Sequence, residues 1–166
     1  MPIHPWARAT EEADFGVLTA TTNDIIATSA IHFGYEPLGQ DDLRNLWSAH
    51  RDRFPWLTMV DDAGTILGYA KAGMWRERAA YQWTCETTIY MTAAARGQGH
   101  GRALYRSLLD ACVLRGFHSA VGGITLPNPA SVRLHESLGF VAVGVFKAAG
   151  SKFDRWHDVG FWQRML

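Results

Sequence analysis

The sequence has few cysteines, no long apolar run and no excess of charge of either sign. Its two cysteines, Cys85 and Cys112, do not have the spacing of a metal site. No apolar run approaches the roughly 20 residues of a membrane-spanning helix. The start, Met1 to Trp6, lacks the charged and apolar regions of a signal peptide. We therefore expect a soluble, cytoplasmic protein without a metal.

The balance of charge limits the classes of partner. Sixteen Lys and Arg residues match sixteen Asp and Glu residues, so no overall field attracts nucleic acid or an anionic membrane. A chain of 166 residues is long enough to bury a hydrophobic core as one domain. We expect a single domain over residues 1–166 that binds small molecules, with no nucleic-acid or membrane partner.

A glycine-rich segment directly precedes a helix-forming run at 102–114. Glycines at alternate positions let the backbone turn tightly and bring bare N–H groups toward an anion at the positive end of the helix. The segment is not a P-loop, because Arg102 and Ala103 stand where Lys and Ser/Thr are needed. Its spacing also differs from the G-x-G-x-x-G of dinucleotide-binding folds. We predict a pyrophosphate cradle of another kind at Arg96-Gly97-Gln98-Gly99-His100-Gly101.

Periodicity and turn signals predict alternating helices and strands. A short strand ends at Thr10, which we expect to cap a helix that continues to Gly34. Further helices are expected at 40–53, 102–114 and 128–139, and further strands at 56–60, 65–73, 81–91, 118–125, 140–147 and 158–164. This order predicts a mixed α/β fold in three layers, with helices on both faces of the sheet.

The order of strand, glycine turn, helix, strand and Asn-initiated helix resembles that of the GCN5-related N-acetyltransferase (GNAT) superfamily. In that family the motif Gln/Arg-x-x-Gly-x-Gly/Ala wraps the pyrophosphate of acetyl-CoA, and residues 96–101 match it. The chain is most similar to phosphinothricin and methionine sulfoximine acetyltransferases, through segments 80–90, 126–128, 131–140 and 156–163. The resemblance implies a three-layer α/β/α fold with a mostly antiparallel central sheet, and acetyl-CoA as cosubstrate.

Glu86 is the candidate general base. Alternation on its strand places it on the same face as Thr84, Thr88 and Tyr90, where a carboxylate can take the ammonium proton directly or through water. The alternative is a structural glutamate paired with a buried arginine. The resemblance also implies a bulge near Tyr90 or Met91 that exposes a backbone N–H to the acetyl carbonyl.

Residues after the cradle complete the site that the resemblance implies. His135 stands where many superfamily members have a tyrosine that protonates the CoA thiolate, and the phosphinothricin-type subgroup shares this histidine. It can act as acid or base, or be a helix histidine bonded to a neighbouring carbonyl. Asn128 is expected to cap its helix and to bond the pantetheine arm. Ser137 is expected to touch CoA, as are the residues from Met91 to Ala94.

An acceptor with a carboxylate calls for guanidinium groups. Arg76 and Arg78 are the candidates, with walls formed by Phe33, Trp75 and Tyr81. The alternative for each arginine is a solvated charged turn. A protein or polyamine amine, or a non-catalytic CoA-binding module, remains an alternative function.

The pair His157 and Asp158 also resembles catalytic chemistry. Adjacent strand residues point to opposite faces, so we interpret this pair as structural. In related proteins this region helps to form a dimer, which implies a homodimer here, with core or interface residues at Phe161, Trp162 and Leu166.

Overall fold

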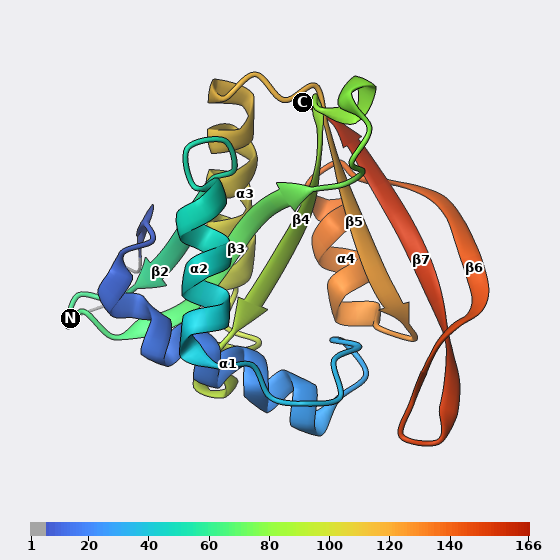
Figure 1. Ribbon diagram of the computed structural model, residues 1–166, viewed down its shortest axis with the longest axis horizontal. Coiled ribbons are helices and arrows are strands. Elements are labelled where there is room, and N and C mark those ends of the chain that lie inside the picture. Colours follow the sequence, from blue (N-terminus) through green and yellow to red (C-terminus); the bar gives the residue numbers. More distant parts are fainter. Residues whose placement is uncertain (1–5) are drawn as a thin grey trace.

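Strands and helices alternate along most of the chain in the computed structural model, which describes residues 6–166 (Figure 1). The expectation about a signal peptide depends on residues 1–5 and so lies outside the described residues. The strands are β1 Trp6–Ala9, β2 Trp56–Val60, β3 Ile66–Met74, β4 Thr84–Met91, β5 Ser119–Leu126, β6 Val141–Lys152 and β7 Arg155–Met165. The helices are α1 Phe15–Thr28, α2 Gln40–His50, α3 His100–Leu114 and α4 Pro129–Ser137, and short 3-10 turns lie at Glu12–Asp14, Ala79–Tyr81 and Ala93–Ala95.

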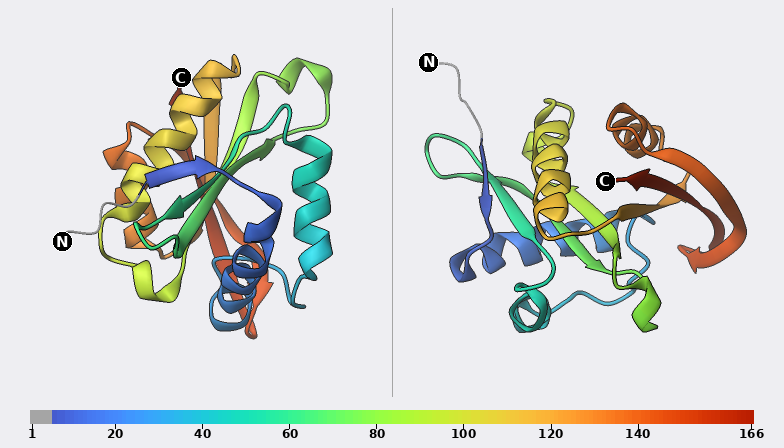
Figure 2. Two further views of the ribbon diagram at one scale, coloured as in Figure 1. Left: turned by 90° about the vertical axis from the view of Figure 1, so that its left-hand side faces the viewer. Right: turned by 90° about the horizontal axis from the view of Figure 1, so that it is seen from above.

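The strands form one seven-stranded sheet in the order β1-β2-β3-β4-β5-β7-β6. Only β4 and β5 run parallel, and every other neighbouring pair is antiparallel. Helices α1 and α2 cover one face, and α3 and α4 cover the other (Figure 2). The predicted three-layer fold with a mostly antiparallel sheet is therefore confirmed.

Two hydrophobic clusters fill the layers because successive strand residues point to opposite faces. Trp56 and Tyr69 pack with α1 and α2 on one side. Ala70, Ala72 and Cys85 pack with α3 on the other. Among the described residues, no helix is long and apolar enough to cross a membrane.

The first helix differs from the prediction at both ends. The Thr10 hydroxyl does not cap it, but forms a buried hydrogen bond with Thr58 at 3.0 Å. The backbone N–H of Glu11 instead donates to Asp14 at 2.9 Å, at the 3-10 turn that precedes α1. At the other end, Ser29 is extended and its hydroxyl donates to the Ile25 carbonyl, so α1 stops at Thr28 rather than at Gly34.

The last two strands are longer than predicted. They join in a tight turn at Phe153 and Asp154, whose φ angles of 52° and 56° are left-handed. Such hairpin turns usually carry Asn or Gly, so the sequence gives little sign of this one. Strand β6 is exposed along most of its length.

Strands β4 and β5 separate soon after they meet. Their ladder contains three residue pairs, from Thr84 opposite Ser119 to Glu86 opposite Val121. Beyond this point the strands diverge, as Figure 1 shows. The expected bulge near Tyr90 is not present, since β3 and β4 stay in register from Gly68 to Met74. Divergence of β5, rather than a bulge, opens the edge of β4.

Candidate active site

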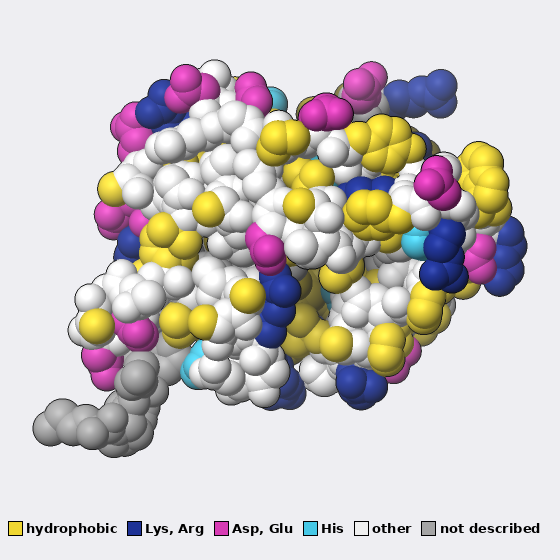
Figure 3. Space-filling view, turned by 90° about the horizontal axis from the view of Figure 1, so that it is seen from below, with side chains coloured by type: hydrophobic (Ala, Val, Ile, Leu, Met, Phe, Trp, Pro, Cys, Tyr) yellow, Lys and Arg dark blue, Asp and Glu magenta, His cyan; other side chains and the backbone are white. Residues whose placement is uncertain are grey.

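The divergence of β4 and β5 leaves a slot between them. A cavity of about 200 Å³ occupies it, and its lining includes Glu86 and Tyr90 from β4, Gly123 from β5, and Asn128 and His135 from α4. Figure 3 views the end of the molecule toward which the strands diverge, and hydrophobic side chains are visible in the hollow at its centre. The slot therefore brings together four of the predicted site residues.

Glu86 lies at the point where the strands part. A Cβ atom added to Gly123 would lie 3.6 Å from Oε1 of Glu86, so the carboxylate reaches across to β5. Burial raises the pKa of Glu86, while the charges of Lys71 and Arg76 act in the opposite direction. No described residue forms a hydrogen bond or an ion pair with this carboxylate. The structural alternative, a buried Glu–Arg pair, has no counterpart in these contacts.

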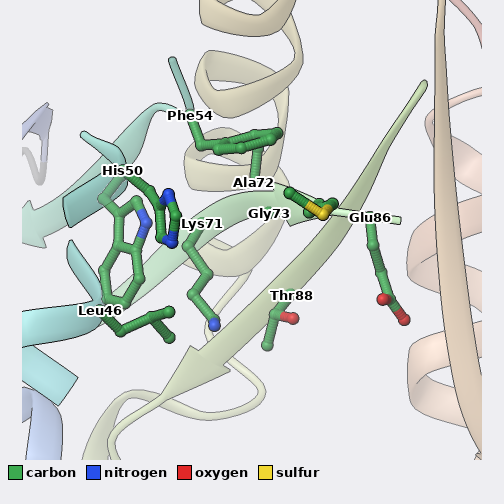
Figure 4. A pocket seen from close by; sticks show the side chains of 10 residues that line it. Leu46, His50, Phe54, Lys71, Ala72, Gly73, Glu86 and Thr88 are labelled. Carbon is green, nitrogen blue, oxygen red and sulfur yellow. The ribbon is translucent and has the colours of Figure 1, made fainter. Parts of the chain in front are cut away.

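A second cavity, of about 300 Å³, adjoins Glu86 on the face covered by α1 and α2 (Figure 4). Leu46 and His50 of α2 form one wall, and Lys71 and Thr88 extend from the sheet. Sequence reasoning did not select Lys71 as a site residue. In the sequence it is a single lysine between two alanines of a predicted strand, and this pattern is equally consistent with an exposed side chain.

The glycine segment forms a turn at the start of α3. Gly97 and Gly99 have φ angles of 75° and 84°, which side chains rarely adopt, so these two positions require glycine. Gly101 is already helical, and a Cβ there would make ordinary contacts with Met91 and Ile89. The first N–H groups of a helix have no partners within it, so this turn presents donors to an anion.

Other side chains of the cradle hold the turn in place. Arg96 donates to the Met91 carbonyl at 3.1 Å and pairs with Asp24 of α1 at 3.1 Å. Gln98 donates to the Ala94 carbonyl at 2.6 Å. His100 begins α3 and is partly buried. In this arrangement the backbone of the segment, rather than the Arg96 guanidinium, is free to meet a phosphate.

Helix α4 begins as predicted. The Asn128 side-chain oxygen accepts from the backbone N–H of Ser131 at 3.1 Å, which confirms the predicted cap. Asn128 also lines the slot. At the other end of α4, the Ser137 hydroxyl donates to the Leu134 carbonyl and lies 3.4 Å from Nε of Arg102. Asn128 therefore lies at the slot, whereas Ser137 faces the first turn of α3.

His135 is buried, and both of its ring nitrogens are hydrogen-bonded. The Ser131 carbonyl can only accept, so Nδ1 carries a proton and donates to it at 2.8 Å. Burial lowers the pKa of His135, which keeps the ring neutral at pH 7. Nε2 then accepts from the Tyr105 hydroxyl at 2.9 Å, and the Tyr105 and Thr87 hydroxyls are hydrogen-bonded at 2.6 Å. This matches the carbonyl-bonded alternative for His135 and also connects the ring to β4.

Four of the five predicted acceptor residues lie together. Trp75, Arg76, Arg78 and Tyr81 line a cavity of about 560 Å³ after β3. The Trp75 and Tyr81 rings meet edge to face at 5.2 Å. Phe33 lies elsewhere, against Gly150 of β6, where any side chain would collide with its ring.

His157 and Asp158 each form hydrogen bonds with other residues rather than with one another. Nε2 of His157 donates to the Lys152 carbonyl at 3.0 Å, and Asp158 accepts from Lys147 at 2.9 Å and from the Ala148 N–H. These contacts tie β6 to β7 and support a structural reading of the pair. No cluster of three or more metal-ligating side chains occurs in the part of the chain that the structure describes.

Comparisons with known proteins agree with this architecture. A sequence model of the acetyltransferase (GNAT) family matches residues 12–140. A phosphinothricin N-acetyltransferase from Streptomyces viridochromogenes is 44% identical over 161 residues, which are 95% of this chain and 85% of that protein. An L-methionine sulfoximine/L-methionine sulfone acetyltransferase from Salmonella typhimurium is 33% identical over 160 residues, with 96% and 93% of the two chains covered.

A similar structure has also been solved with its cosubstrate. A GNAT superfamily phosphinothricin acetyltransferase from Sinorhizobium meliloti, in complex with AcCoA, has a TM-score of 0.94 and 31% identity. The match covers 98% of this chain and 88% of that one. The family model covers most of the chain, and these relatives extend over nearly all of it. The chain therefore belongs to the GNAT family of acetyltransferases.

Proposed function

We propose that this protein transfers the acetyl group of acetyl-CoA to the amino group of a small amino acid or analogue of the phosphinothricin or methionine sulfoximine type. The observation that carries the proposal is the Glu86 carboxylate, which has no hydrogen-bond or ion-pair partner among the described residues and lies where β4 and β5 part. Its position lets one side of the sheet receive the acetyl donor and the other the amine. Both substrates then meet at Glu86 in a ternary complex.

The residues on the donor side fit acetyl-CoA. The turn at Gly97 and Gly99 offers backbone donors to a pyrophosphate at the start of α3. The slot offers the unpaired edges of β4 and β5 and the Asn128 amide to an amide-bearing arm. When bound, acetyl-CoA supplies the activated acetyl group and a thiolate leaving group.

Chemistry at the amine requires removal of a proton, because an ammonium group has no lone pair. Glu86 takes this proton in our proposal, and the raised pKa that burial gives it makes it a stronger base than an exposed glutamate. The thiolate gains a proton as it leaves, and the proton that Glu86 takes from the amine balances this step. His135 also lines the slot, and its one ring proton, on Nδ1, is donated to the Ser131 carbonyl.

Arginines near Glu86 support an amino-acid acceptor. Arg76 is close enough for its charge to lower the pKa of Glu86, and it lines a cavity with Arg78, Trp75 and Tyr81. A guanidinium here can bind the acceptor carboxylate while the amino group faces Glu86. Phe33 does not line this cavity and belongs to the loop after α1. It can contact the acceptor only if that loop forms a second wall of the pocket.

A thiol-release assay tests the proposal. Acetyl-CoA is offered with L-phosphinothricin, L-methionine sulfoximine, a peptide panel and spermidine. Release with the two amino acids, with initial-rate lines that intersect, supports direct transfer in a ternary complex. Release with peptides or spermidine alone would assign a different acceptor. Binding of acetyl-CoA without release for any amine would indicate a binding module.

We also propose that the enzyme is a homodimer in the cytoplasm. Strand β6 exposes Val143 and Phe146, at 65% and 63%, and a second copy would cover them. Sedimentation should give twice the 18.5 kDa chain mass. Val143→Asp should give the single chain mass, whereas the control Val113→Asp, on exposed α3 surface, should leave the mass unchanged. A monomeric wild type would refute the dimer.

A further inference from the structure

Lys71 is partly buried, and its ammonium group has no hydrogen-bond partner among the described residues. It is on β3, directly opposite Thr88, and its side chain lines the cavity beside Glu86 (Figure 4). None of the described residues forms a hydrogen bond or an ion pair with Nζ. The Trp56 ring, whose centroid is 4.9 Å from Nζ, is its one cation–π contact. A cation–π contact fixes the ammonium in place but leaves its three protons free.

Another lysine of the same chain shows how a buried ammonium is satisfied. Nζ of Lys152 donates to the carbonyls of Ile26 at 2.6 Å and of His32 at 2.7 Å. Two of the three ammonium protons of Lys152 are thus bound by backbone carbonyls, whereas no described residue accepts a hydrogen bond from Lys71. Because partial desolvation makes a cation less stable without a partner, an anion or a hydrogen-bond acceptor in the cavity would stabilise Lys71.

The remaining walls of the cavity define the shape of such a ligand. Leu46, Phe54, Trp56 and Met74 provide apolar surface, and Thr88 and Glu86 are the polar groups nearest to the sheet. Gly73 lies opposite Glu86, and a Cβ there would meet nothing within 4 Å, so the floor is open between Lys71 and Glu86. The cavity therefore suits a short aliphatic stem with a polar end.

Strand geometry places the two charged residues on one face of the sheet. Lys71 is two residues from Gly73, and Gly73 faces Glu86, so Lys71 and Glu86 are diagonal neighbours on one face of the sheet. Such pairs have Cα atoms roughly 7–8 Å apart. An α-amino acid whose amine is at Glu86 can therefore extend its side chain toward Lys71 along this face of the sheet.

We infer that Lys71 is a specificity-determining residue that binds the anionic end of the acceptor side chain, such as a phosphinate or a carboxylate. The inference rests on the proposed function and deepens it. It selects amino acids with an anionic side-chain terminus over neutral molecules of the same shape. The alternative is that Lys71 serves only as a counter-charge for Glu86, in which case it would affect every acceptor equally.

Two acceptors of similar shape separate these roles. L-Phosphinothricin ends in an anionic phosphinate, and L-methionine sulfone ends in a neutral sulfone. The ratio of their kcat/KM values is measured for wild type, Lys71→Met, Lys71→Gln and Lys71→Arg. We expect the ratio to fall roughly 10- to 100-fold in the two neutral variants, which is the loss of a charged hydrogen bond, with methionine sulfone little affected. Lys71→Arg keeps a cation and should retain most of the preference.

The control is Arg44→Met, which removes a cation from α2 whose partners are Asp41 and Glu12 outside the cavity. It should leave the ratio unchanged. An equal loss for both acceptors in Lys71→Met, or an unchanged ratio, would overturn the inference while leaving the proposed function intact. If wild type acetylates neither amino acid but still binds acetyl-CoA, the proposed function fails and the inference fails with it. Circular dichroism checks that each variant is folded.

Discussion

Replacement of Glu86 by glutamine separates catalysis from folding. Glutamine has nearly the same shape as glutamate but cannot take a proton, so only the base is removed. General-base catalysis typically contributes about 10²- to 10⁴-fold, or roughly 3–5 kcal/mol of barrier. We expect kcat/KM for the acceptor to fall within this range. Acetyl-CoA affinity should stay nearly constant, because the cradle at Gly97 and Gly99 contains no part of Glu86.

The stability of Glu86→Gln should not fall with its activity. Burial raises the pKa of Glu86, so the folded state holds this proton more tightly than the unfolded chain does. Stability due to this group is therefore lost as the pH rises from the ordinary pKa of a glutamate through the raised value. Glutamine has no charge to bury, and Glu86→Gln should be at least as stable as wild type at neutral pH. At acid pH, where both side chains are neutral, the difference should disappear.

The same titration predicts the pH dependence of the reaction. Protonated Glu86 cannot accept a proton, so wild-type kcat/KM should fall as the pH drops through the raised pKa, and Glu86→Gln should lack this limb. The measurements are thiol release from pH 5.5 to 9, calorimetric titration with acetyl-CoA, and thermal unfolding. Equal turnover in Glu86→Gln would remove Glu86 from the base role. A loss of activity that tracks a loss of stability would also refute the reasoning.

Three further predictions concern the cradle, the histidine network and the charge near the base. Gly99→Ala places an alanine in the left-handed region, so we expect about 1–2 kcal/mol of lost stability in urea unfolding and a higher KM for acetyl-CoA. The matched control Gly101→Ala should alter neither quantity. Equal effects of the two substitutions on both quantities would contradict the cradle. Tyr105→Phe leaves Nε2 of His135 without its donor, and urea unfolding should show a loss of about 1–3 kcal/mol; unchanged stability would mean that this network is not formed. Lys71→Met removes a charge that lowers the pKa of Glu86, so the acid limb of kcat/KM for methionine sulfone should move to higher pH, and a limb that stays in place would show that the two groups are not coupled.

Local signals were sufficient to predict the order of the elements and the glycine turn before α3. Helical and strand periods depend on nearby residues, and Gly97 and Gly99 are required by their own φ angles. The Asn128 cap is equally local, since its partner is three residues away. These predictions needed no knowledge of how distant segments pack.

Features that depend on distant partners were not predictable in this way. Arg96 pairs with Asp24, which lies 72 residues away, so no local pattern shows that its guanidinium is engaged. Phe33 packs against Gly150 of the β6–β7 hairpin, whose turn carries Phe153 and Asp154 rather than the usual glycine. The cavity beside Lys71 depends on α2, whose Leu46 and His50 form one of its walls. The catalytic and binding roles inferred from the sequence stay predictions until the variants are measured.

Because the ladder between β4 and β5 is short, the sheet is open between these two strands over the rest of their length. Past Glu86 and Val121, each strand keeps a partner on its outer edge only, so the inner edges present amide groups without a strand between them. We expect a ligand that carries amides along its length to lie between these edges and to form hydrogen bonds with them. Hydrogen exchange along the inner edges of β4 and β5 should then slow when the ligand binds, because the ligand protects backbone amides that have no strand partner.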